Sequence, residues 1–179
     1  RYSKELAKKV GKELKIPVFL YEFSAINKYR QNLAEIRNGE FEGMFDKLKI
    51  SRWKPDYGPI KPHASAGVTA IGARNFLIAY NINLNTKDKK IATDIALDLR
   101  EQGRNKRNKL GKFIKDENGI PKKKPGILKS CKAVGWYIEE YGLAQVSMNL
   151  TNFNDTTPHK AFEETCNQAH KRGVRVTGS

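Results

Sequence analysis

The sequence DYGPIKPHASAGVTAIGARNFLIAYNINL (Asp56–Leu84) sets the architecture of the chain. Its first half is rich in glycine and proline, and its second half is a long apolar run. Glycine permits backbone conformations and close approaches that other residues block, while Pro59 and Pro62 fix φ. The pattern predicts a ligand-binding loop that leads directly into a central strand. A plain linker with turn glycines is the alternative interpretation.

The predicted central strand, Phe76–Leu84, is apolar at first and then alternates between polar and apolar residues. Asn81 and Asn83 share the face opposite Ile82 and Leu84, because successive side chains of a strand point to opposite faces. We therefore expect one side of the strand's end to be polar and to face a wet cleft.

The residues after this strand predict two helices and three further strands. Thr86 is the expected N-cap and Gly103 the expected end of the first helix, and Thr157-Pro158 begin the second. The order from Asn75 onward is then βαββαβ, a four-stranded antiparallel sheet with both helices on one face. Its other face must be covered by a partner, a ligand or another domain. The remaining predicted strands are Ala133–Glu139, Ala144–Leu150 and the segment from Val174.

The residues before the loop predict a helix over Ser3–Leu14, with Ser3 as its N-cap, and a strand at Val18–Tyr21. Short helices are expected at Asn32–Arg37 and Phe41–Lys49. A helix followed by a strand is typical of the second half of an α/β domain. Because the chain also opens without Met and already in a helical pattern, we expect a piece of a longer protein.

The net charge of +15 is concentrated in one segment. Ten basic residues and two acidic ones lie between 104 and 129, a local net charge of +8. Arg104–Ser130 is therefore interpreted as a basic insertion that forms an extended, partly mobile excursion. The rest of the chain is only mildly basic, which argues against a nucleic-acid surface over the whole protein.

The composition excludes several kinds of site. Cys131 and Cys166 form no C-x-x-C pair, so two free thiols in a reducing cytoplasm are expected, although a disulfide is possible. The three histidines are scattered and predict no metal site. No apolar run approaches the ~20 residues of a membrane span.

Four stretches resemble glutamate formiminotransferase, including the transferase part of formiminotransferase-cyclodeaminase. The resemblance covers nearly the whole chain except the basic insertion, since the family usually has a shorter connection there. The stretches are GVTAIGARNFLIAYNINLNT (Gly67–Thr86), IALDLREQGR (Ile95–Arg104), VGWYIEEYGLAQVSMNL (Val134–Leu150) and TPHKAFEETCNQA (Thr157–Ala169).

The resemblance implies an α+β fold of two ferredoxin-like (βαββαβ) subdomains with facing sheets, the first one truncated. Residues 1–73 would be the latter half of the N-terminal subdomain. Residues 74–179 would be the C-terminal subdomain, incomplete at its end and carrying the insertion 104–130.

The resemblance also implies a cytoplasmic, homo-oligomeric enzyme of histidine degradation that uses no metal. Such an enzyme moves a formimino group between N-formiminoglutamate and tetrahydrofolate, its co-substrate. The family's folate-binding loop falls on the stretch chosen above from composition. Its residues here are Gly58, Pro59, Ile60, Lys61, Pro62, His63, Ala64, Ser65, Ala66 and Gly67.

The family's catalytic histidine lies in a His-Pro-Arg turn that this chain lacks. His63 does not match that motif and is interpreted as a polar loop residue, so no catalytic residue is assigned. We expect the chain alone to be inactive. Arg74 is a candidate clamp for a substrate carboxylate, with a buried structural ion pair as the alternative.

A ferredoxin-like nucleic-acid-binding module that uses the lysine-rich insertion is the competing function. This alternative fits the charge. However, the predicted strands carry no aromatic pair of the kind that stacks on RNA bases, and the basic residues do not spread across the sheet. The sequence therefore favours small-molecule substrates over nucleic acid.

Overall fold

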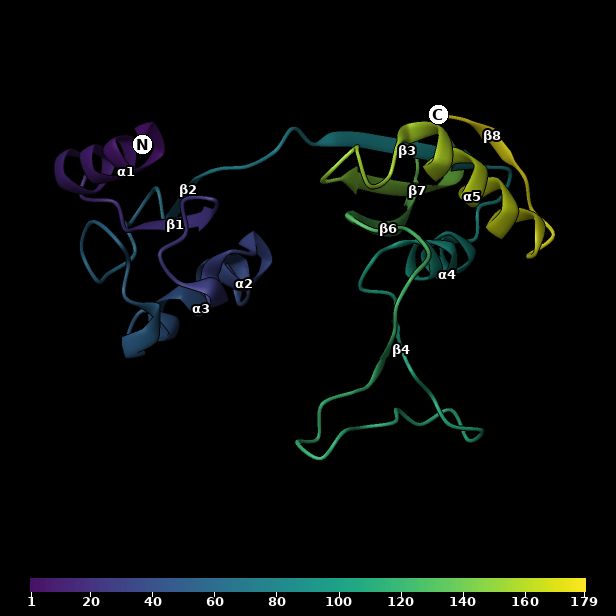
Figure 1. The fold of residues 1–179 in the computed structure, drawn as a ribbon, viewed down its shortest axis with the longest axis horizontal. Coiled ribbons are helices and arrows are strands. Elements are labelled where there is room, and N and C mark those ends of the chain that lie inside the picture. Colours follow the sequence, from purple (N-terminus) through teal and green to yellow (C-terminus); the bar gives the residue numbers. More distant parts are fainter. The chain divides into compact units, whose positions relative to one another are not determined.

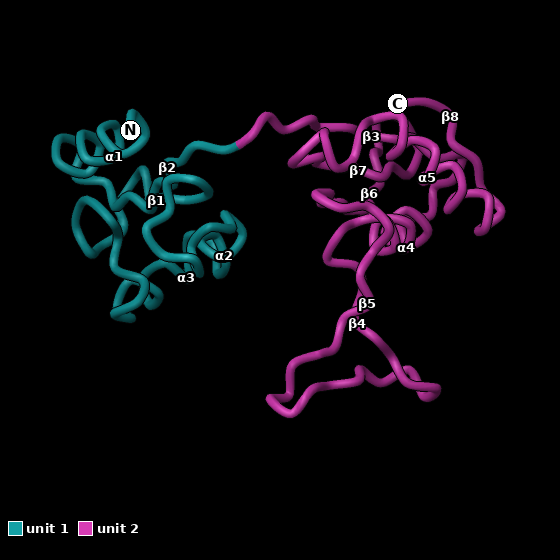
Figure 2. Tube along the Cα trace, in the orientation of Figure 1, with its two compact units in different colours: residues 1–74 teal, residues 75–179 magenta.

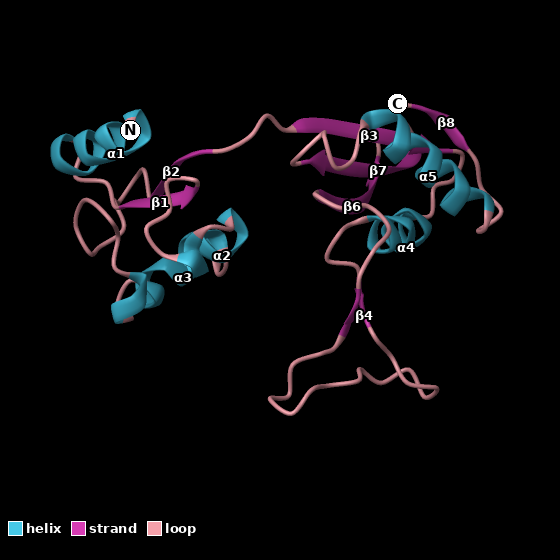
Figure 3. Cartoon of the chain, viewed as in Figure 1, coloured by secondary structure: helices cyan, strands magenta, loops and turns pink.

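The computed structural model describes residues 1–179 and divides them into two compact units, 1–74 and 75–179 (Figure 2). Both units contain helices and strands (Figure 3). Unit 1 contains α1 (Tyr2–Glu13), β1 (Val18–Glu22), the 3-10 helix η1 (Lys28–Arg30), α2 (Leu33–Arg37), α3 (Glu40–Lys47), the 3-10 helix η2 (Ser51–Trp53) and β2 (Thr69–Ala73). Unit 2 contains β3 (Ile78–Leu84), α4 (Lys89–Leu99), β4 (Arg104–Asn105), β5 (Lys123–Lys124), β6 (Cys131–Ile138), β7 (Leu143–Leu150), α5 (Pro158–His170) and β8 (Val176–Gly178).

Unit 1 is built around β1, which pairs in parallel with β2 along its whole length. Val18 and Leu20 pack against Ala7 of α1, whereas Phe19 packs on the opposite face with Trp53 and the residues around it. The strand is therefore buried on both faces, and its unbroken run of apolar residues is typical of a parallel pair. The predicted strand at 18–21 is confirmed.

β2 corrects the prediction that the loop leads directly into the strand at 76. The sequence TAIGA over residues 69–73 looks like a continuation of the loop, but it forms a strand beside β1. A Cβ atom at Gly72 would lie 2.4 Å from the carbonyl oxygen of Tyr21, so glycine is needed for this close pairing. The partner strand lies far earlier in the sequence, and local pattern alone does not reveal it.

Unit 2 contains a four-stranded sheet in the order β6-β7-β3-β8, with every neighbouring pair antiparallel. Apart from the short β4 and β5 pair, its elements follow the predicted order βαββαβ. α4 packs against β6 and β7, α5 packs against β3 and β8, and the two helices contact each other (Figure 1). The core of unit 2 therefore lies between this helix layer and the sheet.

The core of unit 2 is filled by alternate residues of the strands. Ile82 and Leu84 of β3 and Val146 of β7 are fully buried against Ile95 and neighbouring residues of α4. Gly135 allows α4 to approach the backbone of β6 closely, because a Cβ atom at this position would lie 2.0 Å from the backbone nitrogen of Thr93.

The predicted helix boundaries are corrected at two N-termini. Ser3 lies inside α1, where its hydroxyl contacts the hydroxyl of Ser24 at 2.7 Å, and Arg1 is the N-cap. Asp88, not Thr86, caps α4, because its carboxylate accepts the backbone N–H of Lys90 at 2.7 Å. α4 also ends at Leu99, before Gly103. The predicted start of α5 at Thr157-Pro158 is confirmed.

The basic insertion leaves unit 2 between α4 and β6 (Figure 1). Two side chains shape its tips. The Asn108 side chain accepts the backbone N–H groups of Leu110 and Lys112 at 3.0 Å. The Asp116 carboxylate likewise accepts from Asn118 and Ile120 at 2.9 Å. Turns of this kind are how Asn and Asp organise a loop without a core.

A buried ion pair joins the start of the glycine-rich loop to η1 and β1 of the same unit. The Arg30 guanidinium donates to the Asp56 carboxylate at 2.8 Å, and their side chains are 5% and 3% exposed. The same carboxylate accepts the backbone N–H of Leu20, and Arg30 also donates to the carbonyl oxygen of Lys54. Trp53, which lies just before this segment, packs with Phe19 and is 8% exposed.

Replacing Asp56 by Ala is expected to lower the free energy of unfolding of unit 1 by about 3–5 kcal/mol, because it leaves a buried guanidinium uncompensated. Urea unfolding followed by tryptophan fluorescence measures the change. Asp46→Ala is the matched control, since the Asp46–Lys49 pair is exposed on α3 and its loss should leave stability unchanged. Equal stability of the two variants would contradict the role given to the buried pair.

Candidate functional site

A pocket of about 640 Å³ lies within unit 1, between α2, α3 and the second half of the glycine-rich loop. Its walls are mostly apolar or made of small residues, a composition typical of sites for small organic molecules. The lining residues are Leu33, Ile36, Arg37, Glu40, Phe41, Met44, Ala64, Ser65, Ala66, Gly67, Val68 and Ala70.

The structure divides the predicted folate-binding loop into two parts. Ala64, Ser65, Ala66 and Gly67 line the pocket, whereas residues 58–63 are not part of its lining. Gly58 instead has a packing role, because a Cβ atom there would lie 2.3 Å from the carbonyl oxygen of Ile16 and its φ is +84°. Whether the whole loop contacts a ligand stays a prediction.

Gly67 allows the loop to close against α3. Its φ is +63°, in the left-handed region, and a Cβ atom would lie 3.1 Å from the ring of Phe41. A side chain at this position would therefore strain the backbone and press on an aromatic wall of the pocket.

His63 organises the loop from within. Its backbone exchanges two hydrogen bonds of 2.8 Å with Gly67, and its Nδ1 atom accepts the backbone N–H of Ala66 at 3.1 Å. Ser65 donates its own backbone N–H to the same atom at 3.3 Å. These contacts agree with its interpretation as a polar loop residue, since the nitrogen that would act as a base is engaged in the turn.

Arg74 is exposed at the end of unit 1, directly after β2, and does not line the pocket. Its role as a carboxylate clamp stays a prediction. The pocket residues of α2 and α3 were not singled out from the sequence. Phe41 and Phe45 stack edge to face and are each 45% exposed, a property that their helical spacing could not reveal.

The open face of the sheet in unit 2 carries a row of polar side chains. The Trp136 indole N–H donates to the Gln145 side chain at 2.8 Å, and Gln145 donates to Asn83 at 2.7 Å. These three residues are direct neighbours across β6, β7 and β3. The structure thus confirms a polar side at the end of β3 and adds Gln145 and Trp136, which the alternating pattern of β6 and β7 could have indicated.

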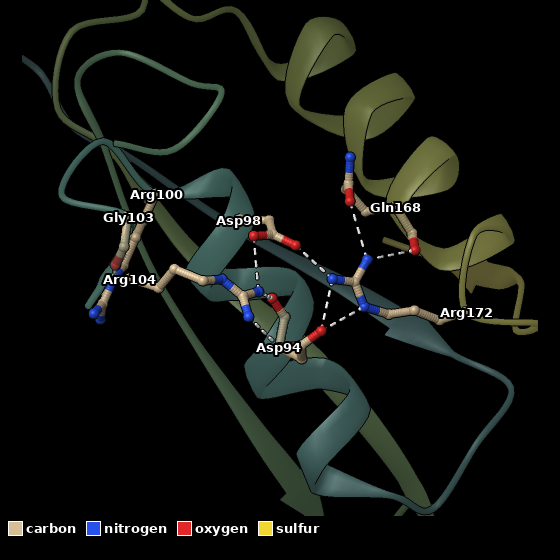
Figure 4. A network of polar contacts seen from close by, with 7 residues as sticks. All are labelled: Asp94, Asp98, Arg100, Gly103, Arg104, Gln168 and Arg172. Carbon is tan, nitrogen blue, oxygen red and sulfur yellow. Dashed lines mark hydrogen bonds and ion pairs between the residues drawn. The ribbon is translucent and has the colours of Figure 1, made fainter. Parts of the chain in front are cut away.

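Four charged side chains tie α4 to the base of the basic insertion and to the residues after α5 (Figure 4). Arg104 contacts Asp94 and Asp98 at 2.7 Å each. Arg172 contacts the same two carboxylates and also donates to the carbonyl oxygen of Gln168. The network is only partly exposed, so it holds three segments together more firmly than a surface pair would.

Two opposing effects act on the pKa of Asp94. Burial raises the pKa, but hydrogen bonds from Arg104 and Arg172, together with their positive charges, outweigh burial and leave the pKa below its usual 3.8. A carboxyl whose folded-state pKa is lowered adds stability that is present above the unfolded pKa and is lost as the pH falls through the folded one.

A second pocket, of about 910 Å³, lies in the basic insertion. No acidic residue lines it, and its apolar residues are Leu97, Phe113, Ile114, Ile120 and Pro121. The cationic residues that line it are Arg100, Arg104, Lys106, Arg107, Lys123 and Lys124.

The cysteines offer no activated nucleophile. Both are free, and Cys131 is buried in the core of unit 2. Burial raises the pKa of the Cys131 thiol to about 12 and also raises the pKa of Cys166. The structure contains no group of three His, Cys, Asp or Glu residues placed to hold a metal ion, and none of its helices has the length and apolarity of a membrane span.

An apolar pocket beneath a glycine-rich loop, in one of two α/β units, is typical of a protein that binds a small organic molecule. Comparison with known families makes the class specific. Residues 79–179 match the formiminotransferase domain, and residues 1–74 match the N-terminal subdomain of that domain. The chain belongs to the formiminotransferase family, and the resemblance in sequence motifs is confirmed.

Curated relatives match over nearly the full chain. Glutamate formimidoyltransferase from Streptococcus pyogenes serotype M1 is 43% identical over 177 residues, 99% of this chain and 52% of the relative. Formimidoyltransferase-cyclodeaminase from Dictyostelium discoideum is 44% identical over 178 residues, 99% of this chain and 30% of the relative. The chain therefore spans about half the length of the former protein and about a third of the latter.

Arg172→Gln is expected to lower the free energy of unfolding of unit 2 by about 1 kcal/mol at pH 7, a modest value because solvent partly screens the pair. The deficit should shrink as the pH falls below the ordinary pKa of 3.8 and through the lowered folded-state pKa of Asp94, because wild type then loses the same contribution. Urea unfolding at a series of pH values measures this. Arg175→Gln is the control, since Arg175 is exposed and is not one of the residues whose ion pairs form the network. A deficit that stays constant down to pH 2.5 would argue against the role of Asp94.

Proposed function

We propose that this chain forms folate- and substrate-binding surfaces of a glutamate formimidoyltransferase. Such an enzyme moves a formimino group between N-formiminoglutamate and tetrahydrofolate in histidine degradation. The observation that carries the proposal is the 43% identity to a glutamate formimidoyltransferase over 99% of the chain, which includes the loop at the pocket.

The fold supports the same assignment. The βαββαβ order of unit 2 and its strand order β6-β7-β3-β8 are those of a ferredoxin-like subdomain, and we assign residues 74–179 to it. Residues 1–73 would then be the latter half of the N-terminal subdomain. The facing of the two sheets, the homo-oligomer and the cytoplasmic location stay predictions.

The pocket of unit 1 fits part of a folate. Its 640 Å³ lies in the range of small-molecule sites and can take a fused heterocycle. Apolar side chains of α2 and α3 would cover the flat faces of the ring, and the backbone of Ala64–Gly67 would supply polar contacts at the loop. Bound folate would supply the amine that accepts the formimino carbon.

The chain's own contribution is binding and orientation. Formimino transfer needs a positioned acid/base to move protons while the amine attacks the amidine carbon. His63 holds its own turn, both cysteine thiols are disfavoured as thiolates, and no His-Pro-Arg turn is present in these residues. We therefore expect the chain by itself to bind folate without measurable transfer.

Calorimetric titration of the chain with folinate, a stable folate, tests the function. Gly67→Ala should weaken binding about tenfold or more, because the new Cβ strains the loop and displaces Phe41. Gly142→Ala is the matched control: its φ of +62° is equally left-handed, but a Cβ there meets nothing within 4 Å. Folinate binding that is absent from wild type, or equal in both variants, would argue against this site.

The cationic pocket of the basic insertion keeps one alternative function open, a nucleic-acid-binding module. Six cationic and no acidic lining residues favour a polyanion there. Titration with a labelled single-stranded RNA at two salt concentrations separates the functions. Salt-dependent RNA binding without folinate binding would reverse the assignment.

We further propose that Arg74 clamps a substrate carboxylate in the complete enzyme. Its planar guanidinium can donate two parallel hydrogen bonds, which a lysine cannot reproduce. Arg74→Lys in a complete enzyme carrying this sequence should raise the KM for formiminoglutamate or folate about tenfold, as steady-state kinetics would show. An unchanged KM for both substrates would exclude the clamp, and Arg175→Lys serves as the control for an exposed arginine outside the loop.

A further inference from the structure

The pocket of unit 1 has a distinctive charge pattern. Only Arg37 and Glu40 among its lining residues carry a charge, and the rest are apolar or small. Both also line an adjoining hollow of about 370 Å³, which places them at the border between the two spaces. The charged residues at this edge of the pocket are therefore one glutamate and one arginine.

The two ends of a folate differ in charge and in hydrogen-bonding groups, and so in how well they match this edge of the pocket. The benzoylglutamate tail ends in two carboxylates, which Glu40 would repel and a single arginine would only partly neutralise. The pterin is flat and uncharged, and its amino-pyrimidinone edge presents two N–H donors side by side with a carbonyl oxygen. A carboxylate accepts two parallel N–H donors in a bidentate pair, and a guanidinium donates to a carbonyl.

Glu40 is also held in an unusual backbone conformation. Its φ is +51°, directly after Gly39 with a φ of +90°, and a left-handed conformation is disfavoured for residues other than glycine. The charge of Glu40 at the start of α3 does not explain this, because Glu42 lies in the same first turn and favours the helix dipole equally. Lys15, Glu22 and Ser130 also have a positive φ, so this conformation is a strain that Glu40→Gly would relieve and does not by itself mark a site.

We propose that the pocket of unit 1 takes the pterin end of the folate and that Glu40 recognises the two N–H donors of its amino-pyrimidinone edge. The inference rests on the proposed function. Arg37 faces the same edge and accommodates the pterin carbonyl, while Phe41 and the backbone at Gly67 cover the ring faces. The benzoylglutamate tail extends out of the pocket.

Calorimetry on the 179-residue chain tests the assignment, because unit 1 alone lines the pocket. The probes are folinate, 6-methyltetrahydropterin, which lacks the tail, and p-aminobenzoylglutamate, which lacks the pterin. Wild type should bind the first two, and p-aminobenzoylglutamate should not displace the pterin. Glu40→Gln should weaken both by about 10- to 100-fold, the effect of losing a charged hydrogen-bond pair. Glu42→Gln, with the same loss of charge in the same turn, should change affinity less than about twofold.

Glu40→Gly separates recognition from folding. It removes the carboxylate and also relieves the left-handed strain, so the Tm should stay equal or rise while pterin affinity falls as in Glu40→Gln. A lowered Tm with unchanged affinity would show a purely structural role and overturn the inference.

The experiment distinguishes failure of the pterin assignment from failure of the proposed folate function. If wild type binds folinate but Glu40→Gln binds it equally well, or if p-aminobenzoylglutamate competes for the pocket, the pterin assignment is wrong and the folate function stands. If wild type binds neither folinate nor the pterin, the proposed function fails and the inference fails with it.

Discussion

The buried pair between Arg30 and Asp56 is the constraint on which unit 1 depends. One carboxylate joins η1, the backbone of β1 and the segment that opens the glycine-rich loop. A buried ion pair is tolerated when the polar atoms of both side chains have hydrogen-bond partners. In this pair, whose side chains are only a few per cent exposed, the Nε of Arg30 is the one atom without a partner. Because Asp56 immediately precedes the loop, the same interaction that stabilises the unit also fixes where the loop begins.

The loop then serves two purposes in succession. Its first part packs under the connection between α1 and β1, where Gly58 leaves no room for a side chain. Its second part turns back through the paired backbones of His63 and Gly67 and forms one wall of the pocket. α2 and α3 form the other wall. Loops that a rigid scaffold positions commonly carry function.

Unit 2 places its ion-pair network and its row of hydrogen-bonded polar side chains on different elements. The carboxylates of Asp94 and Asp98 on α4 form ion pairs with Arg104 and Arg172 (Figure 4). The positive charge of Arg104, at the base of the insertion, is therefore neutralised by residues of the same unit. The hydrogen-bonded row of Trp136, Gln145 and Asn83 lies on the open sheet face.

The sequence by itself determined the apolar periodicities, and hence most of the helices, the antiparallel order of unit 2 and the family, because these depend on neighbours along the chain. Motifs such as GARNFLIAYNINL carried the family without any structure. Only the tertiary structure decided that residues 69–73 form a strand, since its partner β1 is distant in sequence. It also decided that half of the predicted loop lines a pocket, that His63 is engaged in its own turn, and that Glu40 lies at the pocket edge with a positive φ. The β1–β2 pairing and the pocket depend on contacts between segments far apart in the chain, which no local pattern encodes.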